Sequence, residues 1–112
     1  MVSLEADALD PGALLAGFCN GRSDVGAVVS FTGLTRAQTK GSAVSQLSLD
    51  AWPGYTQAVM AQLEAETRAR FPVIDVIVAH RWGDLAVGEP IVFVAVAAEH
   101  RRAAFEAADF LM

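Results

Sequence analysis

Two stretches in the second half of the chain have the pattern of buried β-strands. Residues 73–82 alternate, with Ile74, Val76 and Val78 on one face, whereas residues 91–98 are apolar without interruption. An alternating strand has one buried face, and a continuously apolar strand is covered on both faces. The connection between them is too short for a parallel crossover, so antiparallel pairing is predicted. Because a chain of this length has few elements with which to cover both faces, the pattern also predicts a dimer.

The preceding part of the chain is predicted to add further strands. Residues 25–34 are apolar and rich in residues that favour strands, and residues 46–51 alternate between polar and apolar positions. The polar segment between them, residues 35–41, has the composition of a loop. These two strands and their connection are therefore predicted to form a hairpin with a long loop. A short first strand is expected over residues 2–6.

Three helices are predicted between and after these strands. The first begins at Asp10 and Pro11, because aspartate caps free backbone N–H groups and proline is tolerated at the first helical position. The second covers residues 55–70, and the third begins after Glu99. Helices inserted between mainly antiparallel strands indicate an α+β fold, with residues 1–112 as a single domain.

Composition and charge exclude several classes of protein. Of the 112 residues, 54% are hydrophobic and 19% are charged, which suits a folded domain. The formal net charge of −5 argues against a nucleic acid or an anionic membrane as partner. The longest apolar run, residues 91–98, is far shorter than the roughly 20 residues of a membrane span.

The N-terminus and the single cysteine predict a cytoplasmic protein. The first residues lack the basic and apolar regions of a signal peptide. Cys19 is the only cysteine, so an internal disulfide and a cysteine-rich metal site are excluded, and a reducing compartment is indicated. No spacing of ligand residues in the sequence predicts a metal site.

The segment Glu99-His100-Arg101-Arg102 is the strongest candidate for binding chemistry. It lies where the last strand is followed by the last helix. Cations in the first helical turn face the positive end of the helix dipole, which costs about 0.3–1 kcal/mol each. Free N–H groups and guanidinium groups at such a place would suit a bound phosphate or carboxylate. The alternative is that the arginines point into solvent or pair with neighbouring carboxylates.

The polar loop that carries Arg36 and Lys40 is the second candidate. It follows a strand that ends in Phe31-Thr32-Gly33, where glycine allows a ligand to approach the backbone closely. The alternative is an ordinary solvated loop. If this loop and the start of the last helix came together, they would form one positive site on an acidic protein.

Four stretches between residues 24 and 112 form a series of motifs. They are Gly26-Ala27-Val28-Val29-Ser30-Phe31-Thr32-Gly33 followed by Arg36, then Leu49-Asp50-Ala51-Trp52-Pro53-Gly54, then His80-Arg81-Trp82-Gly83-Asp84-Leu85 followed by Val87-Gly88-Glu89, and finally residues 92–97 followed by His100-Arg101. In this order and register they resemble the large, catalytic subunit of molybdopterin synthase. That family usually has Glu and Tyr where this chain has Asp50 and Trp52.

The resemblance implies a fold, a reaction and a set of partners. The fold would be the α/β hammerhead, assembled as a homodimer at the centre of a heterotetramer. Each copy would bind a small ubiquitin-like sulfur carrier whose C-terminal thiocarboxylate enters the active site. The enzyme would transfer sulfur to cyclic pyranopterin monophosphate and form the dithiolene of molybdopterin, in the biosynthesis of the molybdenum cofactor. No metal or organic cofactor is implied for this chain.

The resemblance also implies site residues. The first substrate-binding stretch would be Leu34, Thr35 and Arg36, the second His100 and Arg101, and the pocket-lining positions Phe31 and Met112. In the family dimer the second stretch serves the active site of the other copy. Arg36 and Arg101 would hold the phosphate and stabilise developing charge. His100 would donate a hydrogen bond or move a proton, because imidazole exchanges protons near neutral pH.

One departure from the family affects the expected activity. The family continues beyond the position of Met112 with a lysine-bearing helix and an aromatic-and-lysine segment, whereas the only lysine here is Lys40. The expectation is therefore a catalytic subunit that lacks the family's catalytic tail and is inactive in this form if nothing supplies it. The alternative is a non-catalytic dimeric scaffold that retains carrier or pterin-phosphate binding. A third reading is an unrelated α+β dimer that binds a small anion.

Overall fold

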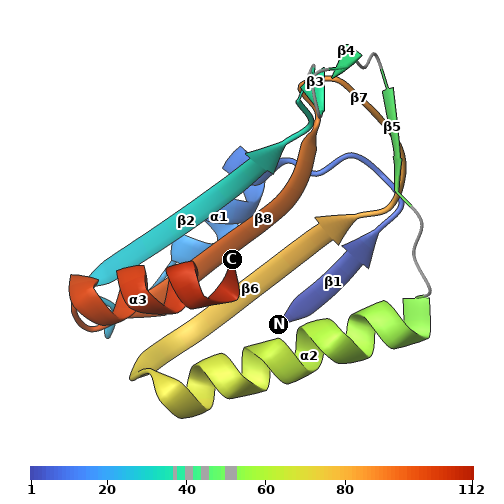
Figure 1. The fold of residues 1–112 in the computed structure, drawn as a ribbon. Helices are drawn as coiled ribbons and strands as arrows, with labels where there is room; N and C mark the ends of the chain where they lie inside the picture. Colours follow the sequence, from blue (N-terminus) through green and yellow to red (C-terminus); the bar gives the residue numbers. More distant parts are fainter. Residues whose placement is uncertain (37, 40–41, 44–45, 50–52) are drawn as a thin grey trace.

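The computed structural model describes residues 1–36, 38–39, 42–43, 46–49 and 53–112 (Figure 1). Lys40, Asp50 and Trp52, which the sequence analysis singled out, lie outside the described residues. In chain order, the elements are β1 (Val2–Glu5), α1 (Pro11–Cys19), β2 (Ala27–Leu34), β3 (Gln38–Thr39), β4 (Ser42–Ala43), β5 (Gln46–Leu49), α2 (Pro53–Arg70), β6 (Val73–Arg81), β7 (Gly83–Ala86), β8 (Pro90–Ala98) and α3 (Arg101–Leu111).

The main sheet has the strand order β1-β6-β8-β2 in the described part of the chain. β8 pairs antiparallel with β6 on one side and with β2 on the other, and β1 adds to β6 in parallel. The predicted antiparallel pairing of the two apolar stretches is thus confirmed, as is an α+β fold. The apolar strand β8 takes the central place because both of its faces are hydrophobic.

Helices cover both faces of this sheet (Figure 1). Val94 and Val96 of β8 belong to a buried cluster against which α2 and α3 pack, whereas Phe93 and Ala95 belong to a second cluster on the side of α1. A single chain therefore supplies the cover that β8 needs on its two faces. The argument for a dimer from this strand's hydrophobicity was wrong, because it underestimated what three helices cover.

The predicted long-looped hairpin was also wrong. β2 pairs with β8, whereas the second strand of that hairpin, β5, pairs with β7. β7 lies in the short connection between β6 and β8, for which no strand was predicted, and its Leu85 is fully buried. The segment between β2 and β5 holds its own small hairpin, β3 with β4. β2 joins the main sheet because its apolar residues can be buried beside β8.

The helices begin and pack much as their sequences predict. The side chain of Asp10 accepts a hydrogen bond from the backbone N–H of Ala13 at 3.1 Å, which caps α1. In α2, Met60 and Leu63 pack against the core cluster on their side of the sheet. Among the described residues, no helix is both long and apolar enough to cross a membrane.

Charged side chains join the two helical layers at the start of β6. One carboxylate oxygen of Asp75 accepts from Arg22 at 2.6 Å, and the other accepts from Arg68 at 3.0 Å. Partial burial raises the pKa of Asp75, but the hydrogen bonds from Arg22, Arg68 and the N–H of Val76 outweigh it and hold the pKa below 3.8, the ordinary value. Asp75 therefore links the segment after α1 to α2.

Replacing Asp75 tests this link. Asp75→Asn should lower the free energy of unfolding at pH 7 by about 0.5–1 kcal/mol, because the pairs are partly exposed and screened. Since the folded-state pKa is lowered, the contribution is complete above the ordinary pKa and is lost as pH falls through the folded-state value. Urea unfolding between pH 2 and pH 7 measures it. Asp7→Asn, at an exposed position, is the control; equal losses in both variants would contradict the link.

Gly26 is required where the chain enters β2. Its backbone N–H donates to the carbonyl of Ala98 at 3.0 Å. A Cβ atom at this position would overlap the backbone carbonyl oxygen of Glu99. The absence of a side chain thus allows the start of β2 to lie against the end of β8, directly before α3.

A pair of glycine substitutions tests this close approach. Gly26→Ala should lower the free energy of unfolding by about 1–3 kcal/mol, because backbone must move to admit the methyl group. Gly17→Ala is the matched control: it lies inside α1 with open space around it, and alanine there should be neutral or stabilising. Thermal and urea unfolding measure both variants, and equal stabilities would reject the close approach.

Candidate anion-binding site

The start of α3 lies beside a surface hollow of about 530 Å³. Residues at one end of the β2–β8 pair, where β2 begins and β8 ends, line it, namely Gly26, Ala27, Glu99, His100, Arg101 and Arg102. His100 is the N-cap residue in an extended conformation, and its side chain makes no capping hydrogen bond. The N–H groups of the first helical turn are therefore not satisfied by the cap residue, which leaves them available to an anion.

The positive groups at this hollow are not neutralised by strong internal pairs. His100 Nε2 lies 3.5 Å from Glu99 Oε1, but the two side chains are 83% and 77% exposed, so this contact contributes little. Arg101 and Arg102 are exposed, and neither forms an ion pair with another described residue. Of the two alternatives for these arginines, pairing with neighbouring carboxylates is thus not observed. The site combines open N–H groups, an imidazole and two guanidinium groups.

The first expected substrate-binding stretch, Leu34, Thr35 and Arg36, lies at the far end of β2. The side chains of Leu34 and Arg36 are exposed, whereas Thr35 between them is only 3% exposed. Thr35 donates from its hydroxyl to the carbonyl oxygen of Glu89 at 3.0 Å. Thr35, which belongs to the expected substrate-binding stretch, directs its hydroxyl to the turn that contains Glu89.

Within one chain the two stretches do not come together. Ala27 pairs with Ala98 at one end of the β2–β8 ladder, and Leu34 pairs with Pro90 at the other. A strand of eight residues rises about 3.3 Å per residue, so the ends lie roughly 25 Å apart. Figure 1 shows the start of α3 at one end of β2 and the β3–β4 hairpin at the other. The antiparallel pairing of two long strands separates them.

The two expected pocket-lining residues, Phe31 and Met112, share one hollow, which is separate from the hollow at the start of α3. Phe31 and Met112 line a space of about 250 Å³ together with Phe105 of α3 and four neighbours, Val29, Ser30, Ala108 and Asp109. Phe31, Phe105 and Met112 are all substantially exposed. This hollow lies along β2 between the two charged stretches and presents apolar surface.

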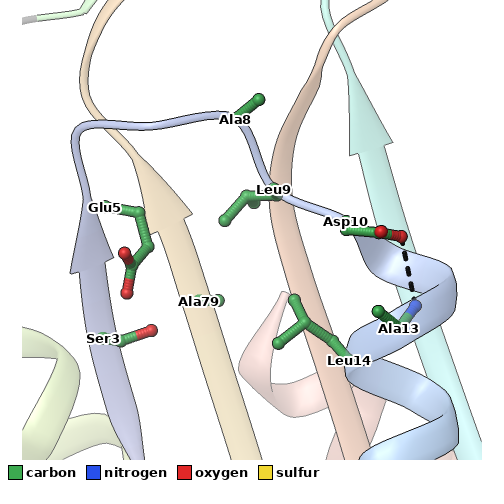
Figure 2. A pocket seen from close by; sticks show the side chains of 8 residues that line it. All are labelled: Ser3, Glu5, Ala8, Leu9, Asp10, Ala13, Leu14 and Ala79. Carbon is green, nitrogen blue, oxygen red and sulfur yellow. Dashed lines mark hydrogen bonds between the residues drawn. The ribbon is translucent and has the colours of Figure 1, made fainter.

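Another hollow, of about 330 Å³, lies on the α1 side of the sheet (Figure 2). It is lined by Ser3, Glu5, Ala8, Leu9, Asp10, Ala13, Leu14 and Ala79. None of the residues expected in the site lines it. The carboxylate of Asp10 points to Ala13 and caps α1, so this residue has a structural task.

Sequence reasoning missed a buried ion pair near Arg36. Arg81, at the end of β6, is 6% exposed and pairs with Glu89. Both residues stood in the third sequence motif, but nothing in their spacing indicated that they meet. Separately, no group of three or more His, Cys, Asp or Glu side chains is placed to hold a metal ion among the described residues.

Comparison with known proteins assigns the family. The family model for "MoaE protein" matches residues 4–112. The chain is 46% identical over 112 residues to a molybdopterin synthase catalytic subunit from Caulobacter vibrioides, covering 100% of this chain and 73% of that protein. It is 44% identical over 111 residues to the subunit of the same name from Mesorhizobium japonicum, covering 99% of this chain and 69% of the relative. The chain belongs to the MoaE family.

Solved MoaE structures have the same fold. The MoaE protein from Burkholderia ambifaria superposes with a TM-score of 0.89 at 32% identity, over 100% of this chain and 73% of that one. Molybdopterin synthase from Staphylococcus aureus superposes with a TM-score of 0.86 at 27% identity, over 96% of this chain and 77% of that one. The predicted family, its α+β fold and a role in molybdenum cofactor biosynthesis are thereby confirmed.

Proposed function

We propose that this MoaE chain binds cyclic pyranopterin monophosphate and carries out its conversion to molybdopterin. Sulfur would come from the thiocarboxylated C-terminus of a ubiquitin-like small subunit. The observation that carries the proposal is the start of α3, where His100 and Arg101 flank open N–H groups on a protein of net charge −5. Such a local positive site suits a phosphate-bearing substrate.

Each candidate residue has a role that its surroundings support. Arg36 and Arg101 are exposed cations that hold the phosphate and stabilise negative charge that develops as its ring opens. His100, also exposed, donates a hydrogen bond or moves a proton during sulfur transfer. Leu34, Phe31 and Met112 offer apolar surface to the pterin. Thr35 acts indirectly, through the backbone that precedes Arg36.

The proposal requires two copies of the chain. Arg36 and Arg101 lie at opposite ends of β2 in one copy, so one substrate contacts both only if a second copy brings its α3 to the first copy's Arg36. The assembly is a central homodimer with a small subunit on each copy. We place this assembly in the cytoplasm. A reducing compartment is compatible with the free thiol of Cys19.

A second candidate function is a dimeric scaffold without catalysis. The observation that favours it is that the exposed arginines and uncapped N–H groups at the start of α3 suffice to bind a phosphate without any chemical step. Mixing the chain with a thiocarboxylated carrier and the pterin precursor, with and without an added lysine-bearing tail, separates the two. Dithiolene formed with the tail supports the enzyme, whereas binding without any dithiolene in both mixtures supports the scaffold.

Arg101→Ala should raise the dissociation constant for the pterin phosphate by roughly 10- to 100-fold, because a charge-assisted contact is lost. Arg70→Ala removes the same charge at an exposed position outside the hollow and should raise it by less than about threefold through the general field. Calorimetric titration of the chain with its small subunit bound measures both. An unchanged constant in Arg101→Ala, or equal losses in the two variants, would remove its phosphate role.

Mixing two variants that each bind the pterin phosphate weakly tests the shared site. In a dimer of Arg36→Ala with Arg101→Ala, one site lacks both arginines and the other is intact. After exchange of subunits, about one quarter of all sites should regain the original affinity for the pterin phosphate. Titration of the mixture against each variant measured separately gives this fraction. No recovery after exchange, or a monomer in sedimentation at micromolar concentration, would contradict the shared site.

A further inference from the structure

Thr35 is held by the turn that connects β7 to β8. Its backbone N–H and its hydroxyl both donate to the carbonyl oxygen of Glu89, each at 3.0 Å. Its own carbonyl oxygen accepts from the N–H of Gly88 at 2.8 Å. Every polar group of this residue is therefore occupied by two residues of one turn, and Arg36 is joined directly to it.

The buried guanidinium group of Arg81 holds this β7–β8 turn in place. The carboxylate of Glu89 binds the Arg81 guanidinium through one oxygen and accepts from the N–H of Ala86 at 3.0 Å through the other. Arg81 also donates to the carbonyl oxygen of Asp84 at 3.2 Å. Glu89 thus connects Arg81 to Thr35. Its carboxylate binds Arg81, and its backbone carbonyl oxygen accepts from Thr35.

Stability is a poor explanation for this ion pair, whose arginine is buried and whose glutamate is partly buried. Arg81 is 6% exposed, and its Nε has no hydrogen-bond partner among the described residues. The desolvation of a buried ion pair offsets most of its attraction, so apolar residues of similar size are often equally stable. An unsatisfied buried N–H adds a further cost. An ion pair does fix the relative orientation of its two side chains, whereas apolar packing leaves that orientation less defined.

We infer that Arg81, Glu89 and Thr35 are positioning residues that fix the backbone from which Arg36 reaches the substrate phosphate. The inference rests on the proposed phosphate role of Arg36. The exposed side chain of Arg36 begins one peptide unit after a residue whose backbone is bound on both sides. Less conformational freedom is then lost when the guanidinium binds, so a site built this way gains affinity.

A double-mutant cycle between Thr35 and Arg36 tests the inference. Thr35→Val keeps the volume of the side chain and removes the bond from the hydroxyl to the Glu89 carbonyl, while the backbone bond remains. Thr35→Ser keeps both bonds. Thr35→Val should raise the dissociation constant for the pterin phosphate by about fivefold, as expected for one lost hydrogen bond, and Thr35→Ser by less than twofold. In an Arg36→Ala background, Thr35→Val should have no further effect.

The outcomes separate this inference from the proposed function. If Arg36→Ala leaves the affinity unchanged, the phosphate role of Arg36 is wrong, and the positioning role falls with it. If Arg36→Ala weakens binding while Thr35→Val does not, only the positioning role is wrong. If Thr35→Val weakens binding equally with and without Arg36, its effect is a general structural one and the inference is also overturned.

A second variant tests the buried end of the same connection. Glu89→Gln keeps the shape of the side chain and removes its charge, while the backbone carbonyl that binds Thr35 remains. Hydrogen exchange of the Thr35 and Gly88 amides should speed up by about tenfold or more, while the amides of β6 keep their protection. Unchanged exchange at Thr35 and Gly88 in a folded Glu89→Gln protein would show that Arg81 does not act through this path. A uniform increase across the sheet would indicate loss of global stability and would equally overturn the inference.

Discussion

The burial of β8 on both faces is the constraint on which the rest of the molecule depends. Alanine and valine side chains along this strand are almost completely removed from water, between the α1 cluster on one side and the α2–α3 cluster on the other. A strand with two hydrophobic faces needs a neighbour on each edge as well as a helix on each face, because its backbone groups must be paired where water is excluded. β6 and β2 supply the edges and the three helices supply the faces.

This arrangement separates the positive groups of the candidate site. β2 and β8 run antiparallel, so the start of α3 meets the beginning of β2, and Arg36 follows its end. The same pairing that buries the core therefore places the two expected substrate-binding stretches at opposite ends of one sheet. The second copy in the proposed function follows from this geometry of the ladder, since the core of one chain is already covered.

The arginines at the two ends of the sheet have different surroundings. At one end Arg81 is buried and matched by Glu89, within a turn whose backbone binds Thr35. At the other end Arg101 and Arg102 are exposed beside helix N–H groups that the cap residue leaves open. An internal ion pair can organise its neighbours, whereas cations without internal partners are available to an anion from outside.

The sequence by itself determined the three helices, the strands of the main sheet, the central strand and the family. Local chemistry was sufficient for the cap of α1 by Asp10 and for the period of α2, because these depend on neighbours a few residues away. The uninterrupted apolar run was sufficient to place β8 in the interior. The order of four motifs was sufficient for the MoaE family, and it indicated Arg36, His100 and Arg101 as site candidates.

Tertiary structure decided which strands pair, and with them where the site residues lie. The hydrophobic pattern of β2 fits pairing with β5 and with β8 equally well, since period and composition do not specify an edge partner. The contact between Arg81 and Glu89 likewise has no sequence signal, because it depends on the path of the turn between β7 and β8. The burial of Thr35 follows from that turn, because its hydroxyl and both backbone polar groups bond to Gly88 and Glu89.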